Sequence, residues 1–130
     1  MTTYLADSSL WIDYLRRDDS PLHAFIRENT AGHTEPVAME LLAGTRRDQD
    51  TVDVERLLLR SPLVRFDSAS DFAAATEFRR SALREGLGVG IVDCMILAVA
   101  ARTQVPLLTL DRAQAALARV HGVAASVPAV

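Results

Sequence analysis

The sequence predicts an α/β fold in which a short parallel sheet is flanked by helices on both faces. Short apolar segments that suit buried strands alternate with longer amphipathic segments that suit helices. The length of 130 residues suits one domain with a single hydrophobic core. No repeat, linker or low-complexity segment interrupts this alternation, so we expect a single domain over residues 1–130.

The first half of the chain is predicted to form two strands and four helices. Asp7 and the serines that follow it are short polar residues that suit the N-cap of a helix. Pro21 suits the first turn of a second helix, because its missing N–H is not needed there. The expected elements, in order, are a strand at residues 4–6, helices at 10–15 and 21–28, a loop at 29–33, a strand at 34–37, and helices at 38–43 and 51–60.

The second half is predicted to contain the longest helix and the most buried one. Gly86, Gly88 and Gly90 end a helical pattern that begins after Ser68 or Ser70. The segment that follows is apolar nearly all round, so we expect it to be the central buried helix. The expected elements are a strand at residues 63–66, helices ending near 85 and spanning 91–102, a strand at 105–109, a helix at 111–120 and an edge strand at 123–127; Trp11, Phe72 and Phe78 are expected in the core.

Composition excludes several classes of protein. Hydrophobic residues make up 49% of the chain and charged residues 24%, which is typical of a folded globular protein. The longest apolar stretch is interrupted by Asp93 and is too short to cross a bilayer, and the first four residues lack the basic region of a signal peptide. We therefore expect a cytoplasmic protein. The single cysteine, Cys94, rules out an internal disulfide and argues against a zinc cluster.

Three acidic residues follow predicted strands, at the edge of the sheet where sites form in parallel α/β folds. They are Asp7, Glu40 and Asp111. Each also fits a purely structural role: aspartate is a good helix cap, and an acid in the first helical turn interacts favourably with the helix dipole.

A fourth acid, Asp93, lies on the predicted buried helix. Ile96, Leu97 and Ala100 follow it at helical spacing, so its carboxylate is expected to point into the core. Burying an ionised carboxylate without a partner costs several kcal/mol of folding free energy. The chain contains no lysine that could pair with it. We therefore expect that an arginine pairs with Asp93, that a metal ion or proton neutralises it, or that it caps the helix.

If the four acids converge, cations must offset their repulsion. Oxygen ligands favour Mg²⁺ or Mn²⁺, and the three histidines, His23, His33 and His121, show no spacing typical of zinc. One such ion, or two ions about 4 Å apart, suits phosphodiester hydrolysis.

The net charge of −3 argues at first against a nucleic-acid partner. If the four acids bind metal ions, the net charge of the remaining residues is −3 + 4 = +1. In addition, all fourteen basic residues are arginine, which suits phosphate binding. Codon bias in a GC-rich genome explains the arginines equally well.

Four segments of the chain resemble the PIN-domain ribonucleases, in particular the VapC toxins of bacterial toxin–antitoxin pairs. They occur in the family's order, at residues 5–9 (LADSS), 38–44 (AMELLAG), 90–98 (GIVDCMILA) and 108–112 (LTLDR). The resemblance implies a PIN-like three-layer sandwich and an endoribonuclease that cleaves RNA, such as tRNA or rRNA, with Mg²⁺ or Mn²⁺. It also implies inhibition by a VapB-type antitoxin, and we expect a homodimer within a larger toxin–antitoxin complex.

The same resemblance implies the roles of individual residues. The metal-binding and catalytic acids are Asp7, Glu40, Asp93 and Asp111, and Ser9 and Thr109 support them through hydrogen bonds.

The chain departs from the family's pattern at one place. Family members often have a second acid two residues after the position of Asp111, followed by an aromatic residue, whereas this chain has Ala113 and Gln114. A second metal ion would then be held weakly or arrive with the substrate, and whether Asp111 alone suffices is open. The alternative hypothesis is a catalytically silent PIN-like module that binds RNA or a partner protein without cleavage.

Overall fold

The computed structural model describes residues 2–129 and contains a parallel sheet and helices on both sides of it. In order, the elements are β1 (Tyr4–Ala6), α1 (Ser8–Arg16), α2 (Leu22–Arg27), β2 (Ala31–Gly32), α3 (Glu35–Ala43), α4 (Asp48–Leu59), α5 (Ser68–Glu85), α6 (Ile91–Thr103), β3 (Leu107–Leu108), α7 (Arg112–Val120) and β4 (Ala125–Ser126).

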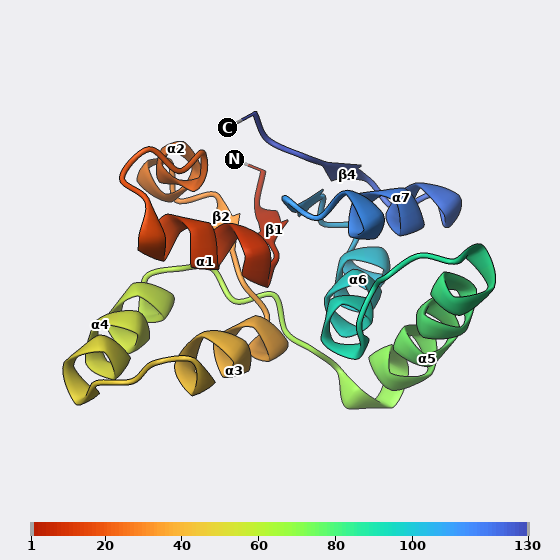
Figure 1. The fold of residues 1–130 in the computed structure, drawn as a ribbon, viewed down its shortest axis with the longest axis horizontal. Coiled ribbons are helices and arrows are strands. Elements are labelled where there is room, and N and C mark those ends of the chain that lie inside the picture. The colour runs from red at the N-terminus through yellow and green to blue at the C-terminus, as the bar shows by residue number, and fades with distance from the viewer. Residues whose placement is uncertain (1, 130) are drawn as a thin grey trace.

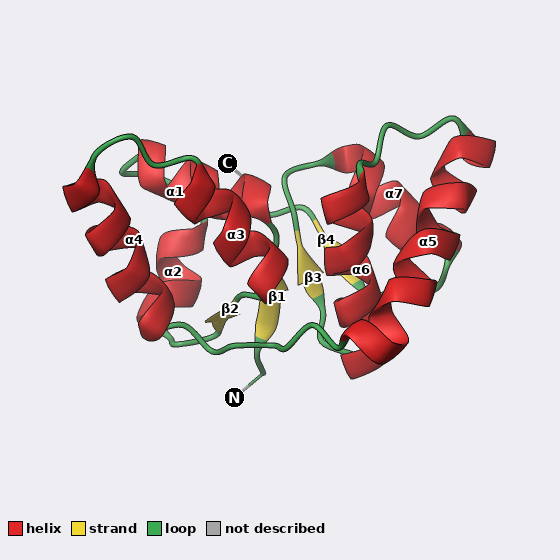
Figure 2. Ribbon diagram, turned by 90° about the horizontal axis from the view of Figure 1, so that it is seen from below, coloured by secondary structure: helices red, strands yellow, loops and turns green. Residues whose placement is uncertain are grey.

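The sheet has the order β2-β1-β3-β4, and its neighbouring strands pair in parallel. From β1 the chain moves first to β2 on one side and later to β3 and β4 on the other. Because crossovers between parallel strands are right-handed, connections in opposite directions place their helices on opposite faces. Figures 1 and 2 show α1 to α4 on one side of the strands and α5 to α7 on the other. The predicted α/β sandwich with a short parallel sheet is confirmed.

The core is built around α6, as the apolar segment predicted. Its residues 96–100 are buried, and it packs against α5, α3 and α7. Trp11 and Phe78 are buried as expected, but the prediction for Phe72 is wrong, because its side chain is 72% exposed. The buried face of α5 contains Asp71, Ala75, Phe78 and Ala82. Phe72 lies one residue, about 100° of helix rotation, away from that face.

The second strand does not lie where the sequence pattern placed it. Residues 34–37 were expected as a strand, but α3 begins at Glu35 with Pro36 in its first turn. Proline cannot donate a ladder hydrogen bond, whereas the first helical turn does not require its N–H. The strand instead forms at Ala31–Gly32, within the expected loop. Gly32 suits this place, because a Cβ there would lie 3.0 Å from the carbonyl oxygen of Tyr4.

The strand expected at residues 63–66 is reduced to one bridge between His33 and Leu63. The N–H of Val64 donates to the carbonyl of His33 at 2.8 Å, and the N–H of His33 donates to the carbonyl of Pro62 at 2.9 Å. This segment thus pairs only with the end of the edge strand β2. The later elements agree with prediction more closely, and α5 ends at Gly86 in the left-handed conformation (φ 69°).

An ion pair between a buried aspartate and an exposed arginine, which the sequence analysis did not predict, links α5 to α6. Asp71 is 1% exposed, and its two carboxylate oxygens accept from Nε and Nη2 of Arg102 at 2.9 and 3.0 Å. The same guanidinium donates to the carbonyl of Arg65. This chain therefore neutralises one buried carboxylate with a forked arginine contact, which is the strongest geometry for such a pair.

Among the helices of residues 2–129, none is long and apolar enough to span a membrane.

Candidate active site

The carboxyl ends of β1 and β3 lie side by side because these strands pair in parallel. Ala6 is paired with Leu108, and the N–H of Asp7 donates to the carbonyl of Leu108 at 3.0 Å. Asp7 and Thr109 are the residues that directly follow these two strands. The register of the sheet thus brings together two polar residues that are far apart in the sequence.

Asp7 is held by hydrogen bonds on both carboxylate oxygens. Oδ1 accepts from the hydroxyl of Ser9 at 2.6 Å and from the N–H of Leu10 at 3.2 Å, while Oδ2 accepts from the hydroxyl of Thr109. The bond from Leu10 makes Asp7 the N-cap of α1. Burial raises the pKa of Asp7, and the three hydrogen bonds oppose that shift. The side chain of Asp7 therefore both caps α1 and belongs to the acidic site.

Asp111 caps α7 in the same way. Its Oδ1 accepts from the N–H of Ala113 at 2.9 Å and the N–H of Gln114 at 3.3 Å. The backbone around it is fixed by the two predicted supporting residues: the N–H of Asp111 donates to the Thr109 hydroxyl at 2.9 Å, and the N–H of Leu110 donates to the Ser9 hydroxyl at 3.0 Å. Ser9 and Thr109 thus connect the segment that follows β1 to the segment that follows β3.

Glu40 lies in the second turn of α3, and not at the helix start where the sequence placed it. Its Oε1 accepts a hydrogen bond from the hydroxyl of Ser8, at the start of α1, and its side chain is exposed. Ser8 is a contact that the sequence analysis missed. The packing of α1 against α3 determines the contact between Ser8 and Glu40, and no local sequence pattern predicts it.

Asp93 lies in the first turn of α6 and is half-buried. Its pKa is raised to about 6, first by burial and then by the negative charges of Asp7, Asp111 and Glu40. The charges of the other three predicted acids therefore all act on Asp93.

The structure excludes one of the alternatives that the sequence left for Asp93. Within residues 2–129, no ion pair involves Asp93 or any of the other three acids, so arginine is not its partner. A backbone hydrogen bond from Gly90, the N-cap of α6, lowers the pKa of Asp93, but this is the smallest of its contributions. Asp93 thus differs from the buried Asp71, whose carboxylate is paired with Arg102.

The four acids fit a hydrated divalent cation. In the part of the chain that the structure describes, no three His, Cys, Asp or Glu side chains are close enough to hold an ion by themselves. Mg²⁺ does not require such a cage, because it keeps several waters and binds through one or two carboxylates together with substrate phosphates. Carboxylate oxygens without a basic partner are the donors that a hard cation prefers.

Gln114 is a second residue that the sequence analysis missed. Its side chain is fully buried, and Nε2 donates to the carbonyl of Asp93 at 3.1 Å. Its Oε1 lies 3.2 Å from the Thr109 hydroxyl. The signal was available, because Gln114 shares helical spacing with the buried Leu117 and Ala118. This glutamine, at the position where an aromatic residue was expected, links α7 to α6 at the acidic site.

The raised pKa of Asp93 makes the stability of the metal-free protein depend on pH. Between the ordinary value of 3.8 and about 6, the folded state binds more protons at this site than the unfolded state. The free energy of unfolding should therefore fall as the pH rises through this range, and Asp7 acts in the same direction. Urea unfolding in EDTA from pH 4 to 7.5 measures this. Asp93→Asn should match the wild type near pH 4 and exceed it at pH 7; curves that stay parallel would contradict the expectation.

Comparison with known proteins adds independent information. The family model of the PIN domain matches residues 4–120. Ribonuclease VapC11 of Mycobacterium tuberculosis is 33% identical over 129 residues, which covers 94% of this chain and 96% of the relative. VapC ribonuclease Mb1587 of Mycobacterium bovis has the same identity and coverage.

Solved structures agree at the level of the fold. The DNA-bound VapBC of Salmonella typhimurium has a TM-score of 0.81 at 19% identity and covers 98% of both chains. VapBC2 of Rickettsia felis, bound to a DNA fragment from the promoter, has a TM-score of 0.78 at 18% identity, with 98% of this chain and 100% of that chain covered.

Proposed function

This chain belongs to the PIN-domain family and, within it, to the VapC ribonucleases, and from this premise we propose that it is a Mg²⁺- or Mn²⁺-dependent endoribonuclease toxin. The observation that carries the proposal is the placement of Asp93: the carboxylate is half-buried, burial and then the charges of three other carboxylates raise its pKa, and no arginine within residues 2–129 pairs with it. The buried Asp71 has an arginine partner, so the lack of one at Asp93 fits a position reserved for a cation.

We propose that Asp7, Glu40, Asp93 and Asp111 bind the metal ion, one or two of these carboxylates directly and the others through its water ligands. A bound Mg²⁺ would supply an activated water and stabilise the leaving oxygen of the phosphodiester. Ser9, Leu10 and Thr109 fix the carboxylate of Asp7, and the backbone of α7 fixes one oxygen of Asp111 and leaves the other for a ligand. Ser8 orients Glu40 from the neighbouring helix. No nucleophilic side chain is required.

The partners follow from the family rather than from geometry. Two of the similar folds come from structures named VapBC, so we propose that a VapB-type antitoxin neutralises this protein. We further propose that one domain over residues 1–130 carries the whole activity, that the protein acts in the cytoplasm on a structured RNA such as tRNA or rRNA, and that it forms a homodimer within the toxin–antitoxin complex. Isolation from its native operon as a lone monomer would contradict the proposals on partners.

Metal removal and replacement tests the proposed activity. Protein freed of antitoxin and treated with EDTA should leave total cellular RNA intact, and added Mg²⁺ or Mn²⁺ should restore discrete cleavage products, seen on a denaturing gel. Protein that binds RNA but leaves it intact at all Mg²⁺ and Mn²⁺ concentrations would instead favour the silent module suggested by Ala113. Cleavage that continues in EDTA would exclude the metal.

A further inference from the structure

A groove beside the acidic site has no role in the function proposed above. It lies between α1, α3 and the start of α4, and its volume is about 710 Å³. Glu40 lines one end, next to the other acids, and arginines from two different elements line the walls: Arg16 from α1, and Arg46 and Arg47 from the turn between α3 and α4. We call it the arginine groove.

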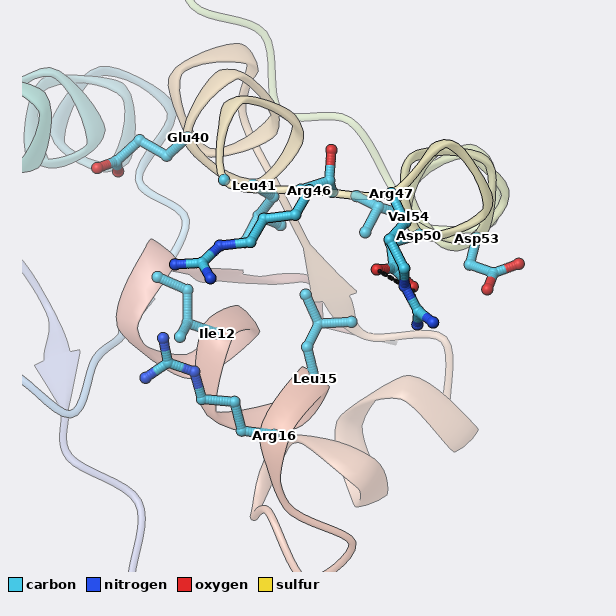
Figure 3. Close-up of a pocket in the computed structure, with 12 residues that line it drawn as sticks. Ile12, Leu15, Arg16, Glu40, Leu41, Arg46, Arg47, Asp50, Asp53 and Val54 are labelled. Carbon is cyan, nitrogen blue, oxygen red and sulfur yellow. Dashed lines mark hydrogen bonds and ion pairs between the residues drawn. The ribbon is translucent and has the colours of Figure 1, made fainter.

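Some charged side chains of the arginine groove already have hydrogen-bond or ion-pair partners, and others do not. Arg47 is paired with Asp50 through two hydrogen bonds of 3.0 Å. Asp53 accepts from Gln49, and Figure 3 shows its carboxylate directed away from the hollow. Three acids thus line the groove, and each is engaged with another group: Asp50 with Arg47, Asp53 with Gln49, and Glu40 with Ser8.

Arg16 and Arg46 are the basic residues that remain. Within residues 2–129, neither forms an ion pair. Figure 3 shows their guanidinium groups extending from opposite walls toward the same end of the groove, the end at which Glu40 lies. Among the described residues, Glu40 forms no ion pair with either arginine and instead belongs to the proposed metal site, so the two guanidinium groups are available to bind an anion.

We propose that Arg16 and Arg46 bind backbone phosphates of the RNA strand, one or more nucleotides away from the bond that is cut. This inference rests on the proposed function, because an RNA strand that passes the four acids must continue along an adjoining surface. The guanidinium fork matches phosphate oxygens, and such contacts position a strand without reading its sequence. The two unpaired arginines would offset the repulsion between the acids and the substrate in a protein of net charge −3.

The test measures binding separately from cleavage. A fluorescently labelled single-stranded RNA of about fifteen nucleotides is titrated with protein in the Asp93→Asn background, in Mg²⁺. Arg16→Gln and Arg46→Gln should each raise Kd about 5-fold, and the double variant about 20-fold or more. The slope of log Kd against log salt should fall by about 0.7 for each arginine removed. A control that removes the same two charges elsewhere is Arg27→Gln with Arg80→Gln, exposed residues of α2 and α5.

The cleavage readout uses the same substitutions in the otherwise wild-type protein. The double variant should raise KM for RNA and leave kcat within about twofold, because the arginines contact the strand away from the reacting phosphate. Thermal unfolding of each variant shows whether the fold is retained, which we expect because both side chains are exposed.

Each outcome decides the inference. RNA affinity and KM that match those of the control double variant would overturn it, and they would do so even if the protein cleaves RNA as proposed. Affinity that depends on both arginines in a protein that never cuts RNA would support the groove and refute the proposed activity. Loss of antitoxin binding alone, with RNA binding unchanged, would assign the groove to the protein partner and overturn the inference.

Discussion

Asp93→Asn is expected to abolish RNA cleavage, with a loss of about 100-fold or more, while the protein stays folded. Asparagine has nearly the same shape as aspartate but carries no charge, so it binds a divalent cation poorly. The negative charges of Asp7, Asp111 and Glu40 act on this position, and no basic residue among those described offsets them. Relief of that repulsion should make the metal-free variant at least as stable as the wild type at pH 7.

Two measurements on purified protein check this expectation: the rate of cleavage of total RNA with and without Mg²⁺, and the binding of Mn²⁺ by electron paramagnetic resonance. The second reports on the site without relying on activity. Asp18→Asn makes the same chemical change at an exposed position and should cleave like the wild type. Equal cleavage by Asp93→Asn and the wild type would make Asp93 structural and the proposed site wrong.

Thr109→Val is expected to lower the free energy of unfolding by about 2 kcal/mol and the cleavage rate by about 10-fold or more. Valine keeps the branched shape but removes the hydroxyl that donates to Oδ2 of Asp7 and accepts from the N–H of Asp111. Thr109 is fully buried, so water does not readily replace either bond. One substitution therefore loosens two of the four acids at once.

A matched substitution separates this effect from the general cost of replacing a threonine. The hydroxyl of Thr103 donates to the carbonyl of Val99 within α6, at 2.7 Å, and contacts none of the acids. Thr103→Val should change stability by less than about 1 kcal/mol and leave cleavage unaffected. Urea unfolding and initial cleavage rates measure both variants. If the two substitutions act alike, the Thr109 hydroxyl does not position the acids.

Local sequence signals account for most of the helices. Asp7 and Asp111 are caps whose side chains accept from the first-turn N–H groups, and Gly86 ends α5 in the left-handed conformation that glycine adopts most readily. The apolar segment around Ile96 and Leu97 became the central helix. These features depend on residues within one or two turns of each other, so the sequence pattern can reveal them.

Short strands were less predictable. β2 has only two residues, so its hydrophobic alternation is too short to recognise, and the pairing with β1 defines it. Pro36 falls within the predicted strand at residues 34–37, although the geometry of proline suits the first helical turn. The exposed Phe72 shows the related limit for helices: an aromatic residue is assigned to the core by type, whereas the packing of α5 on α6 decides which face is buried.

By itself, the sequence determined the fold class, the identity of the candidate acids and the anomaly of a carboxylate on an apolar helix. Only the tertiary structure decided which groups hold those acids. Thr109 and Asp7 are 102 residues apart, and Ser8 and Glu40 are 32 apart. Contacts over such separations depend on the register of β1 against β3 and on the packing of α1 against α3. Hydrophobic periodicity specifies which face of an element is buried, but not which partner residue that face meets.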